Sequence, residues 1–415
     1  MKPRVPRPLI LLSAIFAVLA VSANSCAQEN LSSSKIHGYL DIFQAIEKHS
    51  FYKLEKEELI KMHECILSKA FGSLEIEAGN TLKHAVIIPS CFKQDQHAAY
   101  FTPAELEEIK IRYSGKFFGI GITIRRTEDK SAMVVEEILP TGPAARDGRI
   151  KKGDLIIAAG EDENNLKMVS GLPLTEITHL IRRPKGTKVF LKIRRQDETH
   201  LFAVERDEVK IISIESHEIE KGIGYLKIKS FERERLVREE IGPILTEFKN
   251  GGARALVLDL RNNPGGTLSA TKEFLDKFSP APMTHIVELR GRNGKAEEND
   301  VVVTSGRGEY ADWKVVILVN ENSASASEIV AGVLQLWGHT VVGKKTYGKG
   351  SVQTQMTISD GGAFKFTTAK YYFANDKTPD GTGIIPNLII EDKESQLKSA
   401  VDHLKKGTTT REPTP

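Results

Sequence analysis

Two short apolar runs, Ala255–Leu260 and Val315–Val319, constrain the fold of this chain more than any other feature. Neither run alternates apolar with polar residues, so each predicts a strand buried on both faces, as in a parallel sheet covered by helices. Residues 223–229 alternate like a further strand. Helical patterns follow at 236–248, 270–278 and 327–336. We therefore expect an α/β core over residues 207–395.

Length and charge set broad limits on the rest of the chain. Its 415 residues are enough for two or three domains. The formal net charge is +3, and Lys2, Arg4 and Arg7 supply that excess within the first segment. Without this segment the chain is close to neutral, so we expect no nucleic-acid partner.

The first 27 residues have the pattern of an export signal. Residues 1–8 are basic, residues 9–21 are apolar, and small residues follow to Ala27. Cleavage after Ala27 would give a free protein, whereas cleavage before Cys26 would give a lipoprotein with a lipid anchor on that cysteine. Both alternatives predict an exported protein, either in the periplasm and cell envelope or secreted.

Cys65 and Cys91 are the two cysteines outside this segment. In an oxidising compartment they can form a disulfide, and the alternative is a pair of buried free thiols. The nearby His63 and His97 do not have the spacing of a common zinc site, so we expect no metal.

Residues 28–112 predict an N-terminal helical domain. Apolar residues recur at three- and four-residue spacing over 39–46 and 57–67, and Thr102-Pro-Ala-Glu105 has the composition of a helix start. At the other end, residues 396–415 predict a C-terminal helix and a polar tail that is disordered from Lys405 onward.

Residues 113–206 have a different order of elements. Strands are predicted at 119–124, 133–139, 153–157 and 189–194, with helices at 142–146 and 174–181. This order resembles a PDZ domain, and Phe118-Gly-Ile-Gly121 resembles its carboxylate-binding loop. The resemblance implies that Phe118, Gly119, Ile120 and Gly121 bind the C-terminus of a peptide that adds to the domain as a strand. The alternative is an ordinary glycine-rich hairpin.

Ser323-Ala-Ser-Ala-Ser-Glu328 and Tyr347-Gly-Lys-Gly350 are the candidates for chemistry. The first follows a buried strand and opens a helix, where unpaired amides can stabilise an oxyanion. Its alternative role is a capping box from Ser325 to Glu328. Lys349 lies between glycines with no acid nearby in sequence, so burial would lower its pKa and allow it to act as a base. The alternative is a solvated surface lysine, and Gln353 is placed to hold its amine.

A third segment, Asp259-Leu-Arg-Asn-Asn-Pro-Gly-Gly266, follows the first buried run. Its glycines can present a second backbone amide to a substrate carbonyl, or form a simple turn. Together the three segments resemble the C-terminal processing proteases, also called tail-specific proteases, which are Ser-Lys peptidases with a crotonase-like (ClpP-like) α/β core. That resemblance implies a multidomain α+β protein without a cofactor. Its implied catalytic residues are Ser325 as nucleophile, Lys349 as general base and Gln353 beside it, with oxyanion donors at Ala326 and at Gly265 or Gly266.

The resemblance extends over nearly the whole chain after the export signal. Asp95–Phe101, Ile223–Phe231, Thr368–Tyr372 and Gly381–Pro386 match further family segments. The chain departs from the family by one residue fewer between Ser325 and Lys349, and by an insertion around Cys91. In such families the PDZ domain can gate the active site, which makes Arg182 a candidate relay.

Two other functions compete with this hypothesis. Gly343–Lys349 fits a phosphate-binding loop up to its lysine, but Gly350 stands where magnesium binding needs serine or threonine. The second competing function is that of a noncatalytic PDZ scaffold that binds peptides. We predict a serine endopeptidase that acts on proteins with free, apolar C-termini, with an adaptor protein and a homo-oligomer as open possibilities. The substrate and cleavage preference do not follow from the sequence.

Overall fold

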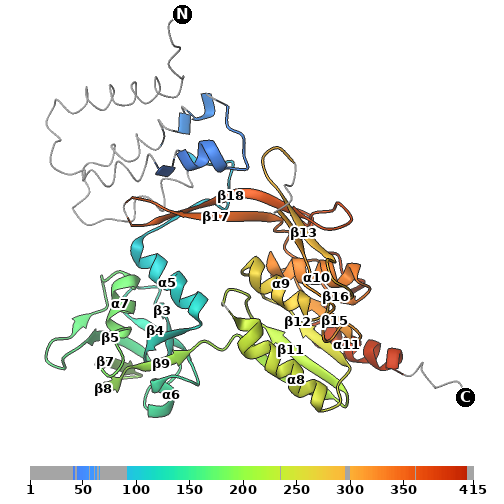
Figure 1. Ribbon diagram of the computed structural model, residues 1–415. Helices are drawn as coiled ribbons and strands as arrows, with labels where there is room; N and C mark the ends of the chain where they lie inside the picture. The colour runs from blue at the N-terminus through green and yellow to red at the C-terminus, as the bar shows by residue number, and fades with distance from the viewer. Residues whose placement is uncertain are drawn as a thin grey trace, which may run out of the picture. The chain divides into compact units, whose positions relative to one another are not determined.

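The computed structural model describes residues 41–62 apart from 43, 56 and 60, residue 65, residues 91–294 apart from 234, and residues 300–408 apart from 360 (Figure 1). The chain divides into two compact units. Unit 1 comprises the chain up to Pro103 together with Gln353–Thr368, and unit 2 comprises Ala104–Val352 and the chain from Ala369 onward.

Unit 1 combines helical residues with strands from a distant part of the chain. Residues 41–49 and 57–62 are helical where described, as the apolar spacing predicts. The strand β1 (Ala99–Phe101) pairs antiparallel with the first residues of β18 (Ala363–Tyr372), and β17 (Ser351–Thr357) also pairs with β18. Ile42, Ile46, Phe92, Phe364 and Phe366 share one core.

Two further links hold unit 1 together. The buried Asp95 accepts hydrogen bonds from the backbone amide of Thr367 at 2.6 Å and from its hydroxyl at 2.9 Å, although the two residues are 272 positions apart. Cys65 and Cys91 form a disulfide, which decides between the two alternatives left open by the sequence. The predicted boundary at residue 112 does not match this division. The N-terminal unit ends earlier, and it needs residues 353–368, which the sequence placed in the protease core, to complete its sheet.

The PDZ region of unit 2 is an antiparallel sheet with two helices. The helix α5 (Pro103–Ser114) precedes it, and the sheet order is β3-β4-β5-β7-β8, with β6 paired to β5. The strands and helices are β2 (Lys116–Gly119), β3 (Ile122–Arg126), β4 (Met133–Ile138), α6 (Pro143–Asp147), β5 (Leu155–Gly160), β6 (Lys167–Met168), α7 (Leu174–Ile181), β7 (Lys188–Arg195), β8 (Glu198–Glu205) and β9 (Asp207–Lys210). Side chains of β7 alternate between core and solvent, with Val189, Leu191 and Ile193 buried. The partner of β2 is β9, so this region extends just beyond the predicted end at residue 206.

The protease core of unit 2 is a six-stranded sheet with the order β10-β11-β12-β15-β16-β19, parallel except for the β10–β11 pair. Its elements are β10 (Ile214–Glu220), β11 (Ile223–Ile228), η1 (Val237–Ile241), α8 (Gly242–Asn250), β12 (Ala255–Asp259), α9 (Leu268–Asp276), β13 (His285–Arg290), β14 (Val301–Val303), β15 (Lys314–Val319), α10 (Ala326–Leu336), β16 (Thr340–Gly343), β19 (Leu388–Ile389) and α11 (Lys393–Thr408). The central strands β12 and β15 are buried on both faces, as predicted.

Alternate side chains of β12 and β15 feed two separate cores. Leu256, Leu258 and Ile317 pack with α8, α9 and α10 on one face, while Val257 and Leu318 pack with α11 on the other. This two-sided burial explains why neither run alternates in sequence. The carboxyl ends of parallel strands meet at one edge of a sheet, so the loops after β12, β15 and β16 are brought close together.

Two predictions of local structure need correction. The helix predicted at 236–248 begins with a π-helical segment, η1, before α8; Pro243 in the first turn of α8 has no amide hydrogen for the regular pattern. The tail predicted to be disordered from Lys405 is helical through Thr408, because the buried Ala400 and Leu404 anchor α11 to the sheet. Within the described residues, every helix is too short or too polar to cross a bilayer.

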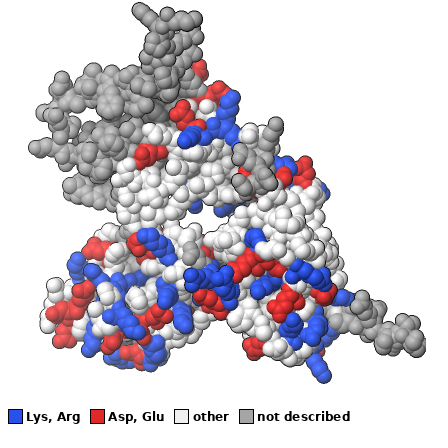
Figure 2. Space-filling model, viewed as in Figure 1, with Lys and Arg blue, Asp and Glu red and all other residues white. Residues whose placement is uncertain are grey.

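Charge is mixed on the face of the molecule that Figure 2 draws. Figure 2 shows lysine and arginine interspersed with aspartate and glutamate on the face drawn. Surface ion pairs such as Lys116 with Glu208 and Lys167 with Glu176 are examples of this mixing. Such a surface lacks, on the side drawn, the continuous basic area that nucleic-acid binding uses.

Candidate active site

Ser325 lies at the turn between β15 and α10 in a conformation that is unusual for a residue with a side chain. Its backbone angles are φ 55° and ψ −116°, and the residues on either side, Ala324 and Ala326, are buried. A positive φ outside glycine costs energy and persists only where the surroundings enforce it, commonly at functional sites. A strained turn from strand to helix also presents the serine side chain outward, as in enzymes with a serine nucleophile at such a turn.

The capping box proposed from Ser325 to Glu328 is present at the start of α10. The Ser325 amide donates to Glu328 Oε2 at 2.8 Å, and the Ser325 side chain faces the Glu328 amide to form the other half of the box. That amide also donates to the Ser325 backbone carbonyl at 2.8 Å. Ser325 therefore caps the helix in addition to any role in chemistry.

Gly265 brings the loop after β12 directly against Ser325. A Cβ atom at Gly265 would lie 2.8 Å from the Ser325 Cβ and 2.9 Å from the Ala326 nitrogen, and its φ is 104°. Only glycine fits this contact. The Gly265 amide donates to Asn263 Oδ1 at 2.9 Å. Within the part of the chain that the structure describes, the amides of Gly266 and Ala326 donate to no protein acceptor, so of the two glycines it is Gly266 whose amide remains available to an oxyanion.

Asn263 joins three segments at this point and was not singled out from the sequence. It is fully buried. Its side-chain amide donates to the Ile228 carbonyl at the end of β11, and its backbone carbonyl accepts from the Ala324 amide at 3.0 Å and the Ser327 hydroxyl at 3.0 Å. The glycine loop and the serine turn are thus fixed to each other by one residue.

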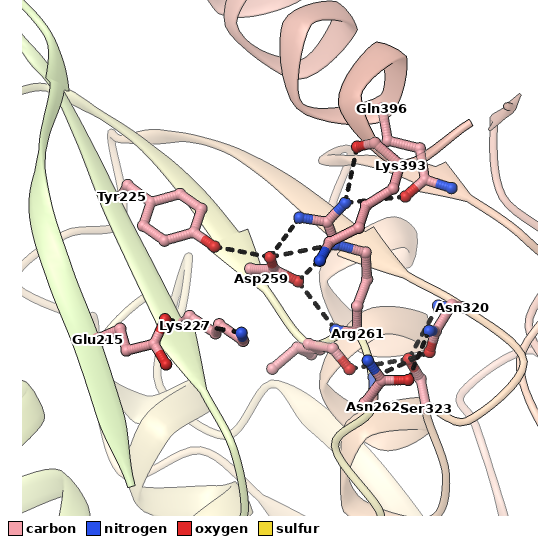
Figure 3. Close-up of polar contacts among 11 residues, drawn as sticks. Glu215, Tyr225, Lys227, Asp259, Arg261, Asn262, Asn320, Ser323, Lys393 and Gln396 are labelled. Atoms are coloured by element: carbon pink, nitrogen blue, oxygen red, sulfur yellow. Dashed lines mark hydrogen bonds and ion pairs between the residues drawn. The ribbon is translucent and has the colours of Figure 1, made fainter. Parts of the chain in front are cut away.

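A charged network fixes the base of the same loop (Figure 3). The buried Asp259 accepts from the Tyr225 hydroxyl at 2.7 Å and from the Arg261 guanidinium at 2.6–3.1 Å. Arg261 also donates to the Lys393 carbonyl and to Gln396 on α11. Burial acts to lower the pKa of Arg261, but its bonds to Asp259 outweigh that effect and raise it. Arg261 therefore stays charged and ties the loop to α11.

The loops after β12 and β15 are also linked beyond this network. The Ser323 hydroxyl donates to the Leu260 carbonyl at 2.8 Å, and Asn262 and Asn320 exchange hydrogen bonds at 2.8 and 2.9 Å (Figure 3). Ser323, the first serine of its motif, therefore has a structural role that differs from that of Ser325.

The structure brings the lysine segment to the serine turn through Glu328. The Glu328 side chain is fully buried. Its Oε2 accepts from the amides of Ser325 and Lys349, each at 2.8 Å, and its Oε1 accepts from the Gly348 amide at 2.7 Å and the Thr346 hydroxyl at 2.6 Å. Lys349 is half-buried rather than fully solvated. One carboxylate therefore holds both segments predicted to carry the chemistry.

Gln353 belongs to unit 1, whereas Ser325 and Lys349 belong to unit 2. Its side-chain amide donates to the Thr367 hydroxyl at 3.3 Å. Its proposed contact with the lysine amine stays a prediction.

The carboxylate-binding loop of the PDZ region has the features of an anion nest. The carbonyls of Ile120 and Gly121 accept from the amides of Ala144 and Leu139 at 2.8 Å, whereas the amides of Ile120 and Gly121 donate to no acceptor among the described residues. Two successive unpaired amides suit a carboxylate. The Phe118 side chain is 46% exposed beside this loop, and β3, which follows it, is an edge strand to which a peptide can add.

Arg182 lies close to this loop. Its guanidinium stacks over the Phe117 ring, 4.4 Å from the centroid, and pairs with Glu108 of α5. Any role in gating stays a prediction. The described residues contain no group of three or more histidine, cysteine, aspartate or glutamate side chains placed to hold a metal ion.

Comparison with known proteins assigns both parts of unit 2. The model of peptidase family S41 matches residues 222–390, and the PDZ domain model matches residues 108–194. A carboxy-terminal-processing protease from Bartonella bacilliformis is 33% identical over 308 residues, which cover 72% of this chain and 67% of the relative. The chain belongs to peptidase family S41.

Other family members agree with this assignment. A probable CtpA-like serine protease from Staphylococcus epidermidis is 31% identical over 74% of this chain, and the match spans 60% of that relative. The solved photosystem II D1 C-terminal processing protease has a TM-score of 0.51 at 20% identity, covering 89% of this chain and 98% of its own, and so shares the fold. This S41 chain is a serine protease of the carboxy-terminal-processing type with a PDZ domain. The comparisons do not support the noncatalytic scaffold.

Proposed function

We propose that Ser325 is the nucleophile and Lys349 the general base of this S41 protease. The observation that carries the proposal is the packing of Gly265 against Ser325 and Ala326. It brings the strained serine and the unpaired Ala326 amide against the glycine loop, in which the Gly266 amide is also unpaired. Glu328 then fixes the lysine segment to the same turn.

The proposed reaction follows from these roles. Neutral Lys349 takes the proton of the Ser325 hydroxyl as the serine oxygen attacks the peptide carbonyl carbon, and the amides of Ala326 and Gly266 bind the oxyanion. Lys349 then protonates the leaving amine as the carbon–nitrogen bond breaks, which leaves an ester on Ser325. Water attacks the ester with Lys349 again accepting the proton, and the freed serine oxygen regains a proton. These reaction steps need no cofactor.

The PDZ loop gives the substrate class. Two unpaired amides bind the free carboxylate of a protein C-terminus, the edge strand β3 accepts its last residues, and exposed Phe118 favours an apolar side chain there. The proposed substrates are therefore proteins with free, apolar C-termini.

We also propose that the protein is exported. The predicted signal over residues 1–27 and the Cys65–Cys91 disulfide both suit an oxidising compartment. Cys26 lies outside the described residues, so the choice between a lipoprotein and a free protein stays open.

The test is proteolysis of an unfolded protein with an apolar C-terminus, free or amidated, by the wild type, Ser325→Ala and Lys349→Ala. We expect both substitutions to abolish cleavage and amidation to weaken it. Cleavage by Ser325→Ala would refute the nucleophile, and cleavage by Lys349→Ala at the wild-type rate would refute the base. Equal cleavage of free and amidated substrate would refute capture through the C-terminus.

A further inference from the structure

A second side chain contacts the same two residues as Glu328. The Tyr371 hydroxyl, on β18, is 3.0 Å from the Lys349 carbonyl and 3.4 Å from the Ser325 carbonyl. Tyr371 is 1% exposed. Burial raises its pKa well above the usual value, and the charges of Glu328 and Asp380 add to this effect. Its hydroxyl therefore keeps its proton and remains a donor at neutral pH.

The two side chains hold complementary groups. Glu328 accepts from the amides of Ser325 and Lys349, and Tyr371 lies at hydrogen-bond distance from the carbonyls of the same two residues. A hydroxyl donates only one proton, and the shorter distance assigns it chiefly to Lys349. Lys349 is thus restrained on both sides of its Cα atom, and Ser325 chiefly at its amide.

We propose that Glu328 and Tyr371 are positioning residues that set the distance and orientation between Ser325 and Lys349. This clamp, defined as the Glu328 carboxylate and the Tyr371 hydroxyl, contacts the backbone of both residues and does not itself transfer a proton. The proposal rests on Ser325 and Lys349 being that pair, as proposed above.

Two physical arguments support a role in positioning. Ser325 keeps a positive φ, which requires a restraint, and the bond from its amide to a buried carboxylate supplies one. Both segments are otherwise loops, whose ends alone do not fix a side chain to within the fraction of an ångström that proton transfer needs. A carboxylate whose four hydrogen-bond partners are three backbone amides and one hydroxyl also restrains both loops.

The central variant is Tyr371→Phe, with Tyr310→Phe as its matched control. Both tyrosines are 1% exposed, but the Tyr310 hydroxyl contacts the Thr246 side chain. Removing the Tyr371 hydroxyl should lower kcat about tenfold with KM unchanged, because a small misplacement of reacting groups is costly. Each substitution should lower the Tm by no more than about 4 °C. The control should keep the wild-type kcat.

Glu328→Gln should have a larger effect of the same kind. Glutamine keeps one carbonyl acceptor but turns an amide donor towards two backbone amides, so one pair of bonds is lost. We expect kcat to fall about 100-fold. Tyr371→Phe leaves the local charge unchanged, and a displaced lysine ammonium is better hydrated, so in this variant the acidic limb of the pH profile of kcat/KM should move to higher pH. A purely structural role would leave this limb in place.

Active sites are titrated with a fluorophosphonate, which labels a reactive serine, so that each kcat refers to folded enzyme. Ser325→Ala runs beside the clamp variants. If Ser325→Ala is inactive and unlabelled while Tyr371→Phe matches Tyr310→Phe in kcat and pH profile, the clamp is refuted and the proposed function stands. If Ser325→Ala still cleaves, the proposed function itself fails. A rise in KM at constant kcat for Tyr371→Phe would also overturn the clamp.

Discussion

The PDZ region and the protease core each bury one charged side chain with neutral partners, and the two sites have opposite polarity. Arg206 is fully buried and donates to the carbonyls of Leu180, Ile181 and Lys188 and to the Thr187 hydroxyl. Glu328 is fully buried and accepts from three amides and a hydroxyl. The cation lies at the C-terminal end of α7 and the anion at the N-terminal end of α10, where unpaired backbone groups and the helix dipole favour each sign.

The partners of these two charges differ in what they do. Arg206 joins α7 to β7, and so stabilises the scaffold of the peptide-binding region. Burial lowers the pKa of its guanidinium, with the charge of Glu161 acting in the opposite direction. Glu328 joins the backbones of Ser325 and Lys349. A buried charge with neutral partners therefore stabilises the scaffold in one region and holds the two proposed catalytic segments together in the other.

The largest expected effect comes from a substitution in the protease core, at Gly265. Gly265→Ala should lower kcat by about 10³-fold, since the new Cβ would collide with Ser325 and with the Ala326 amide, the proposed oxyanion donor. Steady-state proteolysis measures the loss. Gly338→Ala is the control, because that glycine has φ 92° and open space around it. Equal activity of the two variants would contradict the placement of the oxyanion site.

Removing the buried cation should come next. Arg206→Met leaves three carbonyls without donors, which should destabilise the PDZ region by about 3 kcal/mol. Hydrogen exchange of the α7 and β7 amides in the full chain, followed with increasing urea, measures this loss. Arg183→Met is the control, since Arg183 is exposed in its pair with Glu161 and should cost less than about 1 kcal/mol. Comparable losses would show that burial of Arg206 adds nothing.

The PDZ region also has a counterpart of Gly265. Gly121 has φ 77°, and a Cβ there would lie 2.6 Å from the Cα of Gly142. Gly121→Ala should weaken binding of a peptide with a free C-terminus by roughly 30-fold, about 2 kcal/mol, by shifting the carboxylate-binding amides. Fluorescence anisotropy of a labelled peptide gives the Kd. Gly171→Ala shares the positive φ but has open space, so it should bind as the wild type does.

The smallest expected effect concerns a buried acid in the PDZ region. Burial acts to raise the pKa of Asp154, but hydrogen bonds from Arg195 and from the Lys151 amide outweigh it and lower the pKa. Because the pKa of Asp154 is lower in the folded than in the unfolded protein, this carboxylate stabilises the domain at pH values above the unfolded pKa of about 3.9. The contribution is lost as the pH falls through the folded pKa. Asp154→Asn should remove about 1 kcal/mol at neutral pH and flatten the acid limb of stability. The free energy of unfolding of both proteins is measured by urea denaturation from pH 3 to pH 7. An equal pH dependence for the wild type and Asp154→Asn would contradict the prediction.

The fold followed from the sequence where burial leaves a local pattern. The apolar runs predicted β12 and β15, and the period-two alternation predicted β7. In each strand the burial of every side chain determines whether that position is apolar, so the pattern is visible in the sequence. The pairing of β1 with β18 was not predicted, because the short strand β1 carries no signal that identifies so distant a partner.

The site was predictable to a lesser degree. Small residues around Ser325 and glycines around Lys349 marked the two segments, but Glu328 was visible only as a capping residue. Its contacts with Thr346, Gly348 and Lys349 exist only in the folded chain. Asn263 and Tyr371 lie within two segments that were singled out in the sequence, but their residue types also suit a turn and a core strand, so neither was assigned a role of its own. The Asn263 side chain also accepts a hydrogen bond from the Gly265 amide, so that amide is not available to an oxyanion. This bond depends on the side-chain rotamer of Asn263, which the sequence does not give.

The bond between Asp95 and Thr367 has a consequence for the timing of synthesis. The N-terminal unit cannot close its sheet until a segment 272 positions later has been made. At roughly 10 residues per second this is a delay of about half a minute. Lys349 precedes that segment by only a few residues, so the proposed base and the strands that complete the first unit leave the ribosome almost together. A nascent chain interrupted before this point has neither the proposed base nor a finished N-terminal unit.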